Sequence, residues 1–177
     1  KHWRTHKMSQ TQVERLFIAD RPNVYAQIFR QNTGTNASGA YLTANWESED
    51  ATGTGQLGST LVTVSSGVFS FVKTGLYRVT ATATGYLNND SRYAGCQIIT
   101  CSDGSTFNLT NAYGYNSIFS SNSENRYAAN TIHTIMDVTD TTNQKVKMYL
   151  DAENTITWSG ATASNATYIM FEYLGAT

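Results

Sequence analysis

The chain has 177 residues, of which 40% are hydrophobic and 14% are charged, and its formal net charge at pH 7 is −1. This length and hydrophobic content suffice for one domain with a substantial core, and no apolar run approaches the roughly 20 residues of a membrane-spanning helix, so membrane insertion is not expected. A net charge near zero excludes a typical nucleic-acid partner, which would require a basic stripe to bind the phosphates.

Residues 1–22 differ from the rest and are expected to form an N-terminal arm with a short helix. A capping-box pattern begins at Thr11, and Leu16 and Phe17 follow at helical spacing before Pro22 ends the element. Because two helical turns are not stable alone, this segment either packs on its own domain or forms a short three-stranded stalk. The chain begins with Lys and shows no signal peptide, as expected of a processed product, a fragment or the distal part of a longer protein.

A basic and aromatic stretch at residues 1–7 precedes this amphipathic segment. A short apolar helix behind a basic arm suits a groove on another protein. We therefore expect residues 1–20 to bind a partner protein, with Trp3, Leu16 and Phe17 as the anchoring side chains.

From residue 23 to residue 177 the chain has the pattern of a domain built from short strands, turns and polar loops. The expected strands cover 23–31, 41–46, 61–64, 69–71, 76–86, 95–100, 105–109, 131–138, 145–151, 155–158 and 167–174. Hairpin turns are expected at 102–104, where Asp-Gly occurs, and at 139–144. The aromatic but aperiodic segment 112–126 is expected to be a long surface loop. About ten strands without a long helix predict an all-β sandwich.

The segment 67–81 carries the most specific pattern in the chain. A short aromatic strand is followed by a tight turn and then by a long strand in which apolar and polar residues alternate. Phe69, five intervening residues, then Gly75 and Tyr77 match the spacing of a signature in one protein family. The segment resembles the jelly-roll heads of complement q-type proteins and tumour necrosis factor ligands.

This resemblance implies an antiparallel jelly roll whose heads assemble as trimers and act in recognition rather than catalysis. The final strand, 168–174, resembles the closing strand of the inner sheet in those heads. The upstream half of the signature is not met, since Leu57 and Val62 stand where an Asn or Asp and a large aromatic residue or Leu are usual. The relationship that the resemblance implies is therefore remote.

Two sets of apolar residues are assigned on this basis. The predicted core or interface residues are Tyr77, Val79, Val146, Met148, Leu150, Ile169 and Phe171. The outward-facing aromatic residues expected at the homotrimer interface are Phe29, Tyr149 and Tyr173, because an exposed aromatic band on a monomer would favour aggregation.

Four residues lie between the two cysteines, Cys96 and Cys101, so the two are five positions apart. In one straight strand an odd separation places them on opposite faces, so a disulfide would require a bulge or bend. Isolated buried thiols are the other possibility, and two cysteines alone do not form a disulfide scaffold.

No catalytic site is expected. Nucleophilic catalysis needs a base beside the nucleophile, and His133 is the one histidine outside the N-terminal arm. Neither a G-x-S-x-G elbow nor a phosphate-binding glycine motif occurs. The acidic residues fall mainly in expected loops and strand ends, where solvation explains them.

No metal or other cofactor is expected, although Ca²⁺ is kept as an alternative. His2 and His6 lack a third ligand nearby. Asp137, Asp140 and Asp151 flank one expected hairpin, and oxygen-rich loops do bind Ca²⁺.

Aromatic residues in and next to the polar loops form the candidate ligand-binding set. Tyrosine supplies contact area at low entropic cost and a hydrogen-bonding tip, which suits the recognition of sugars or proteins. The set comprises Tyr86, Tyr93, Tyr113, Tyr115, Phe119 and Tyr127. The alternative is that these rings pack over sheet ends or at trimer contacts.

Thr, Ser, Asn and Gly take the place of charged residues, and only one Pro occurs. This composition resembles that of bacteriophage and other viral fibre heads. We therefore expect a non-enzymatic structural and recognition protein at a virion surface, a trimeric knob of a fibre, spike or capsid decoration. Its expected ligand is a host surface, such as a cell-surface glycan or protein, or another virion protein. The alternative is a secreted complement-like or lectin-like binding module of cellular origin.

Overall fold

The computed structural model describes residues 25–49, 55–120 and 123–177, and in these ranges every regular element is a strand. The strands are β1 (Tyr25–Gln31), β2 (Thr35–Tyr41), β3 (Trp46–Ser48), β4 (Gln56–Leu57), β5 (Val62–Ser65), β6 (Val68–Phe71), β7 (Gly75–Leu87), β8 (Ser91–Cys101), β9 (Leu109–Ile118), β10 (Arg126–Val138), β11 (Lys145–Trp158) and β12 (Tyr168–Gly175). The expected N-terminal helix and the anchoring residues Trp3, Leu16 and Phe17 lie outside the described residues.

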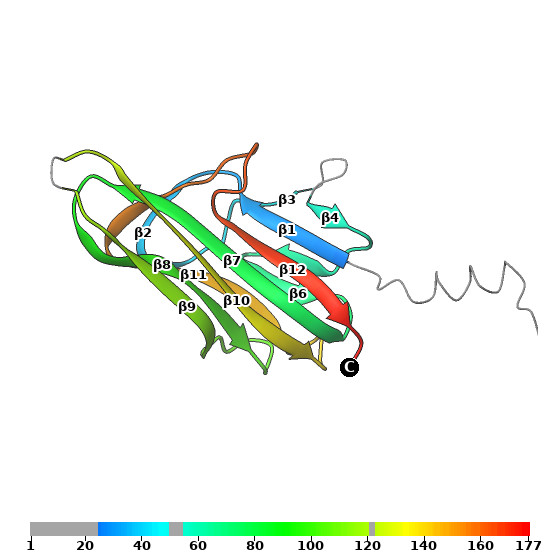
Figure 1. Cartoon of the computed structure of the whole chain (residues 1–177). Coiled ribbons are helices and arrows are strands. Elements are labelled where there is room, and N and C mark those ends of the chain that lie inside the picture. Colours follow the sequence, from blue (N-terminus) through cyan, green and yellow to red (C-terminus); the bar gives the residue numbers. More distant parts are fainter. Residues whose placement is uncertain (1–24, 50–54, 121–122) are drawn as a thin grey trace, which may run out of the picture.

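The strands pair antiparallel in two layers. We call one layer the β12 sheet, in which β3 and β4 pair with β1 and the order continues through β12, β7 and β10. The other layer is the β11 sheet, in which β11 pairs with β8 on one side and with β2 and β6 on the other, and β9 and β5 lie at the edges. Figure 1 shows the long strands of the β12 sheet side by side. This arrangement confirms the all-β antiparallel jelly roll.

The two layers join at one end of the sandwich. There Thr157 and Trp158, the last residues of β11, pair with Asn36 and Thr35 of β2 on one side and with Tyr86 and Gly85 of β7 on the other. A Cβ atom on Gly85 would lie 2.9 Å from the Trp158 ring, so a residue without a side chain lets the indole pack there. The sandwich is therefore closed on this side by continuous hydrogen bonding.

The core lies between the layers and follows the period of two in the sequence. Alternate residues of β7, β12 and β11 have no exposed surface, and all seven predicted core residues are among them: Tyr77, Val79, Val146, Met148, Leu150, Ile169 and Phe171. Burial of each such side chain contributes about 1.5–3 kcal/mol. The prediction of these core positions is confirmed.

The 67–81 pattern has a structural cause. Phe69 lies in a cluster of rings, with its centroid 5.3 Å from those of Phe29 and Phe171. Gly75 has φ 141°, and a Cβ atom there would meet the ring of Tyr173 and the carbonyl of Gly175. The Tyr77 hydroxyl donates to the Lys73 carbonyl at 2.8 Å, which fixes the turn before β7.

Phe29 was expected to face outward, and the structure places it in the core, 3% exposed. In β1 the inward residues are Gln27, Phe29 and Gln31, whereas Ala26, Ile28 and Arg30 point away from the core. Gln27 is accommodated inside because its Oε1 accepts the backbone N–H groups of Leu61 and Val62. The face of β1 that carries Ala26 and Ile28 is therefore the outer one, and the hydrogen-bonded Gln27 lies on the inner face with Phe29.

Several element boundaries differ from those expected. The segment expected as a loop at 112–126 is largely strand, because β9 pairs with β8 up to Ile118 and β10 begins at Arg126. β9 is an edge strand with both faces partly exposed, so its sequence does not alternate. The polar segment 32–38, also expected as a loop, contributes to β2. The strand expected at 155–158 is the end of β11, beyond an irregularity between Asp151 and Ile156.

Cys96 and Cys101 both lie on β8 as free, buried thiols. Burial raises the pKa of Cys96 to about 12, so this thiol stays protonated. Of the two alternatives for this pair, the structure has the isolated thiols. In the described ranges no helix is long and apolar enough to cross a membrane.

Candidate ligand-binding surface

The outer side of the β11 sheet carries a row of polar and aromatic side chains across four strands. The antiparallel register aligns one residue from each of β2, β11, β8 and β9, namely Tyr41, Tyr149, Gln97 and Tyr113. Their chain neighbours Met148, Leu150, Cys96 and Ile98 are buried, so the row itself points away from the core. The next row contains Gly39, Asp151, Gly95 and Tyr115.

We call these side chains, together with Tyr93, the tyrosine face. It consists of Tyr41, Tyr93, Gln97, Tyr113, Tyr115, Tyr149 and Asp151. The rings of Tyr93 and Tyr113 lie 5.6 and 5.7 Å from that of Tyr115, and the ring of Tyr41 lies edge-on to that of Tyr149 at 5.0 Å. Adjacent aromatic pairs of this kind hold each other in position.

A hydrogen-bonded triad lies in the middle of the tyrosine face. The Gln97 amide donates to the Tyr115 hydroxyl at 2.8 Å and to Asp151 Oδ2 at 3.1 Å. The Tyr115 hydroxyl in turn donates to Asp151 Oδ2 at 2.8 Å. Burial, followed by the bond to Asp151, raises the pKa of Tyr115 to about 12. Tyr115 is therefore a protonated donor at physiological pH.

Two oxygen atoms of this triad can accept further hydrogen bonds. Among the described residues no donor is bonded to Asp151 Oδ1 or to Gln97 Oε1. Neither atom is fully buried, because no fully buried side-chain oxygen or nitrogen in that part of the chain lacks a partner. The triad thus presents two fixed acceptors to an incoming molecule.

A shallow hollow of about 290 Å³ lies beside the triad. Its wall contains Tyr41, Gln97, Phe107, Asn108, Thr110 and Tyr149. The Lys147 ammonium group lies 4.3 Å from the ring centre of Phe107 and 5.0 Å from that of Tyr41, in cation–π contact. The Tyr41 hydroxyl donates to the Phe107 carbonyl at 3.4 Å, which ties β2 to the loop before β9.

Two glycines lie beside Asp151 on the neighbouring strands, and neither position has room for a side chain. A Cβ atom at Gly39 would lie 2.9 Å from the Tyr149 hydroxyl, and one at Gly95 would overlap the Gly114 carbonyl. Because neither residue has a side chain, the carboxylate of Asp151 is flanked on both neighbouring strands by bare backbone.

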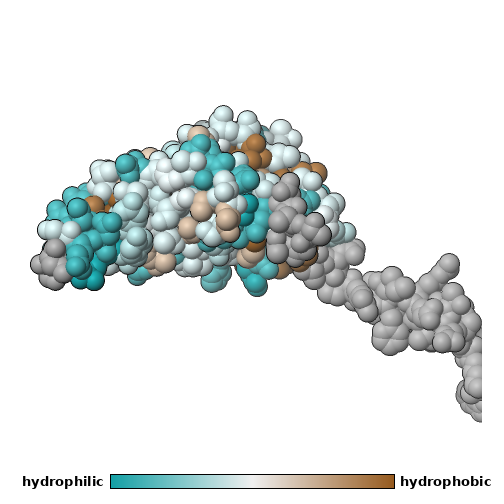
Figure 2. All heavy atoms as spheres, turned by 90° about the horizontal axis from the view of Figure 1, so that it is seen from above, coloured by the Kyte–Doolittle hydropathy of each residue, from teal (hydrophilic) through white to brown (hydrophobic). Residues whose placement is uncertain are grey.

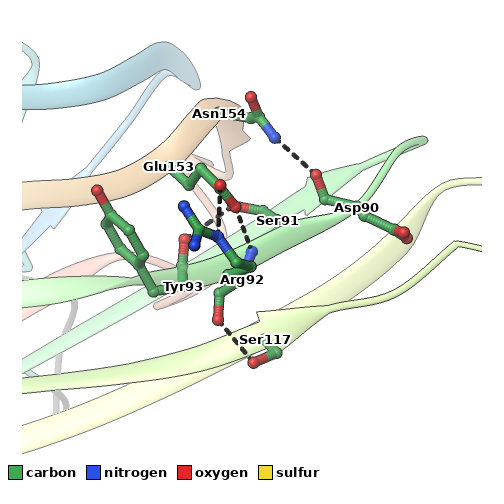
Figure 3. A network of polar contacts seen from close by, with 7 residues as sticks. All are labelled: Asp90, Ser91, Arg92, Tyr93, Ser117, Glu153 and Asn154. Atoms are coloured by element: carbon green, nitrogen blue, oxygen red, sulfur yellow. Dashed lines mark hydrogen bonds and ion pairs between the residues drawn. The ribbon is translucent and has the colours of Figure 1, made fainter.

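Polar contacts fix the end of β8 at which Tyr93 lies. Figure 3 shows Arg92, whose backbone N–H and Nε donate to Glu153 at 2.7 and 2.6 Å, while Ser117 donates to the Arg92 carbonyl at 2.7 Å. The bond from the Arg92 backbone, then that from its side chain, lowers the pKa of Glu153. Strands β8, β9 and β11 are joined at this point, which positions Tyr93.

The six residues predicted to bind a ligand divide among three places. Tyr93, Tyr113 and Tyr115 lie on the tyrosine face. Tyr86 and Tyr127 pair at 5.1 Å across β7 and β10, on the side of the β12 sheet that faces away from the core. Phe119 is exposed in the turn after β9.

The residues expected at a trimer interface also do not share one surface. Tyr149 belongs to the tyrosine face, and Phe29 is in the core. Tyr173 packs at the end of the core, 5.3 Å from the ring of Tyr77, with the Lys73 ammonium group 3.5 Å from its ring centre.

Gln97 and Tyr41 were not singled out from the sequence, and Asp151 was considered there only as a possible Ca²⁺ ligand. The alternation of β11 does place Asp151 on the same side as Tyr149, two residues away. The partners on β8 and β2 depend on strand register, for which the sequence has no local signal.

The carboxylates considered for Ca²⁺ do not converge. Asp140 accepts the backbone N–H groups of Thr142 and Asn143 within its own turn, and its pKa is lowered chiefly by the Asn143 side chain, which also donates to it. Asp151 lies in the triad of the tyrosine face. In the part of the chain that the structure describes, no group of three potential ligands is close enough for a metal ion. His133 is exposed on β10, and His2 and His6 are outside the described residues.

Comparisons with known proteins identify the class of fold. No protein-family model matches this sequence, and no curated protein shows significant sequence similarity to it. The chain is similar in structure to murine APRIL at pH 5.0, with a TM-score of 0.61, 10% identity, and coverage of 85% of this chain and 99% of that one. It is also similar to Eiger TNF from S. frugiperda, with a TM-score of 0.58, 14% identity, and coverage of 88% and 96%.

These likenesses define the fold as a jelly-roll head of the tumour necrosis factor and complement q type. At 10–14% identity they concern the architecture alone. The expectation of this fold, drawn from Phe69, Gly75 and Tyr77, is confirmed.

Proposed function

We propose that the chain is a non-enzymatic recognition module, a trimeric jelly-roll knob at the surface of a virion, where it belongs to a fibre, a spike or a capsid decoration. The observation that supports recognition most directly is the tyrosine face, with its fixed aromatic rings and accessible acceptors on a rigid sheet. Three copies of a weak site at fixed spacing raise the avidity far above that of a single contact. No catalytic step is part of this proposal.

The surface chemistry supports an exposed location of this kind. Figure 2 shows a face on which hydrophilic and weakly polar residues dominate, with hydrophobic residues in small separate patches. Only 14% of the residues are charged, so hydroxyl and amide groups provide most of the solvation. A second candidate function is a secreted binding module of cellular origin, and the jelly-roll likeness to APRIL and Eiger TNF favours this candidate.

The outward side of the β12 sheet is the surface that we assign to the trimer contact. The register aligns Ile28, Met170, Thr80 and His133 in one row. The adjacent rows contribute Tyr168 and Ile135, and Ile135 is 54% exposed. This surface, on which apolar residues lie beside the Arg78–Glu172 ion pair, replaces Phe29, Tyr149 and Tyr173 as the proposed interface, because it faces away from the core.

Ile135→Arg tests this assembly. The substitution adds a cation opposite Arg78, its cross-strand neighbour, on the surface that would be buried. Sedimentation of the unmodified protein should show a trimer of the 19.5 kDa chain, and the variant should sediment as a monomer. Leu109→Arg is the matched control, because Leu109 is 48% exposed on the β11 sheet and its variant should remain trimeric. A monomeric unmodified protein would contradict the proposal.

The virion assignment has its own test. Mass spectrometry of purified particles should detect the chain as a stoichiometric component. Recovery only as a free protein in the medium, absent from any particle, would support the secreted module instead.

A further inference from the structure

We propose that the tyrosine face binds a neutral glycan, with Asp151, Gln97 and Tyr149 as the principal contacts. This inference rests on the proposed recognition function and assigns the ligand class of its site. The first argument is the set of polar atoms. Asp151 Oδ1 and Gln97 Oε1 are acceptors without a partner among the described residues, and the Tyr115 hydroxyl fixes the carboxylate beside them. Neighbouring hydroxyl groups of a sugar ring donate to such paired acceptors.

The second argument is the aromatic surface around these atoms. The Tyr113 ring is 67% exposed, and Tyr41 and Tyr149 line the hollow next to Gln97. A sugar ring has an apolar side formed by its C–H groups, and this side can pack on an aromatic ring while its hydroxyls reach the polar atoms. The combination of apolar ring faces with a few placed polar groups is characteristic of small-ligand sites.

The charged side chains of this surface favour a neutral glycan over an acidic one. One anion, Asp151, lies in the row of the triad, and one cation, Lys147, lies on the other side of Tyr149 along β11. The next carboxylate along the strand, Glu153, is paired with Arg92. Lys147 is engaged with the rings of Phe107 and Tyr41, and a carboxylate at the center of the triad would repel an acidic sugar. The two charges balance, so the face offers no net attraction to a polyanion.

The geometry favours a short oligosaccharide over a peptide. Successive rows on the face are about 7 Å apart, since they differ by two residues of a strand. One sugar can therefore occupy the triad while the next lies in the hollow of about 290 Å³. That hollow is open and partly polar, whereas a peptide anchor requires a deep apolar pocket. Fixed rings and a preformed triad also reduce the entropy lost on binding.

The test uses the full-length protein and a panel of neutral methyl glycosides and oligosaccharides, with sialylated and sulfated glycans as the acidic arm. Saturation-transfer NMR and titration calorimetry should detect weak binding of at least one neutral member. Asp151→Asn and Tyr149→Ala should each weaken that binding about tenfold or more. Phe119→Ala is the matched control, since Phe119 is equally aromatic and exposed but lies off the face. Circular dichroism and sedimentation establish that each variant is folded and assembled.

The outcomes separate this inference from the proposed function. Binding of neutral glycans that is lost in the two face variants and retained in Phe119→Ala supports it. Failure to bind any neutral member, preference for the acidic arm, or binding unaffected by the face variants overturns it. A trimer that enters particles but binds no glycan would leave the proposed function standing and remove the glycan site alone. Capture of a peptide from a displayed library at the same residues would assign the face to a protein ligand instead.

Discussion

At the scale of single residues, two tyrosines have a pKa raised to about 12, and burial is the largest cause in both. Burial and the neighbouring Tyr173 raise the pKa of Tyr77 from 10.0 to about 12. In Tyr115 burial has the largest effect, and the hydrogen bond and charge of Asp151 add to it. Tyr77 serves the fold by closing a turn, whereas Tyr115 holds a carboxylate at the surface. A raised pKa therefore accompanies a structural role in Tyr77 and, in our proposal, a role in binding in Tyr115.

These shifts predict a loss of stability at high pH. Between the ordinary tyrosine pKa of 10.0 and the folded value of about 12, the unfolded chain has lost protons that the folded chain retains. The free energy of unfolding should therefore fall as the pH rises through this window and be unaffected by these groups below it. Denaturant titration at several pH values measures this dependence.

Asp151→Asn separates the two tyrosines. The substitution should lower the pKa of Tyr115, because it removes a negative charge beside the hydroxyl, and should leave the pKa of Tyr77 unchanged. Ultraviolet titration follows the tyrosinate signal, and Tyr115→Phe identifies which step belongs to Tyr115. An unchanged Tyr115 step in Asp151→Asn would contradict the hydrogen-bonded triad.

At the scale of elements, the connection between β6 and β7 explains the one specific motif of the sequence. Phe69 in β6 packs among three rings, with Trp46 at 5.1 Å in addition to Phe29 and Phe171. Gly75 lets the chain turn against Tyr173, and Tyr77 closes the turn by its bond to Lys73. The spacing of the motif is thus the spacing of one turn and the two strands that it joins.

Gly75→Ala should destabilise the protein by more than about 1 kcal/mol, since Ala is strained at positive φ. A Cβ atom at this position would also meet the Tyr173 ring and the Gly175 carbonyl. Gly175→Ala is a matched control, because Gly175 has φ 151° but a Cβ atom there would meet nothing within 4 Å. Denaturant unfolding at one protein concentration should show a larger loss for Gly75→Ala than for Gly175→Ala. Equal losses would show that backbone strain alone, and not the contact with Tyr173, requires the glycine.

At the scale of the whole molecule, the two sheets have different roles in our proposal. The outward side of the β12 sheet carries both apolar residues and the Arg78–Glu172 ion pair and is assigned to assembly, while the β11 sheet presents the tyrosine face away from it. Substitutions on one sheet should therefore change one property without the other, as Ile135→Arg and Asp151→Asn are designed to show. The N-terminal arm is assigned a third role, attachment to a larger assembly.

Deletion of residues 1–20 tests that role. The truncated protein should remain folded and trimeric, because every described strand lies after residue 24. It should no longer be incorporated into particles, and Trp3→Ala combined with Phe17→Ala should have the same effect in the full chain. Circular dichroism, sedimentation and particle composition measure the three properties. An unfolded or monomeric truncation would show that the arm belongs to the core.

The sequence by itself determined the fold class, the core and the turn before β7. The alternation of apolar and polar residues is a local pattern, so the buried positions of β7, β11 and β12 could be predicted without knowing which strands pair with them. Tertiary structure decided the rest. Phe29 lies in the core on the same face as Gln27, whose Oε1 accepts two backbone N–H groups there. β9 is a strand because it pairs with the edge of β8. The triad of Gln97, Tyr115 and Asp151 joins three strands, and its members meet only through the register of those strands, which is set by long-range pairing and not by any local pattern.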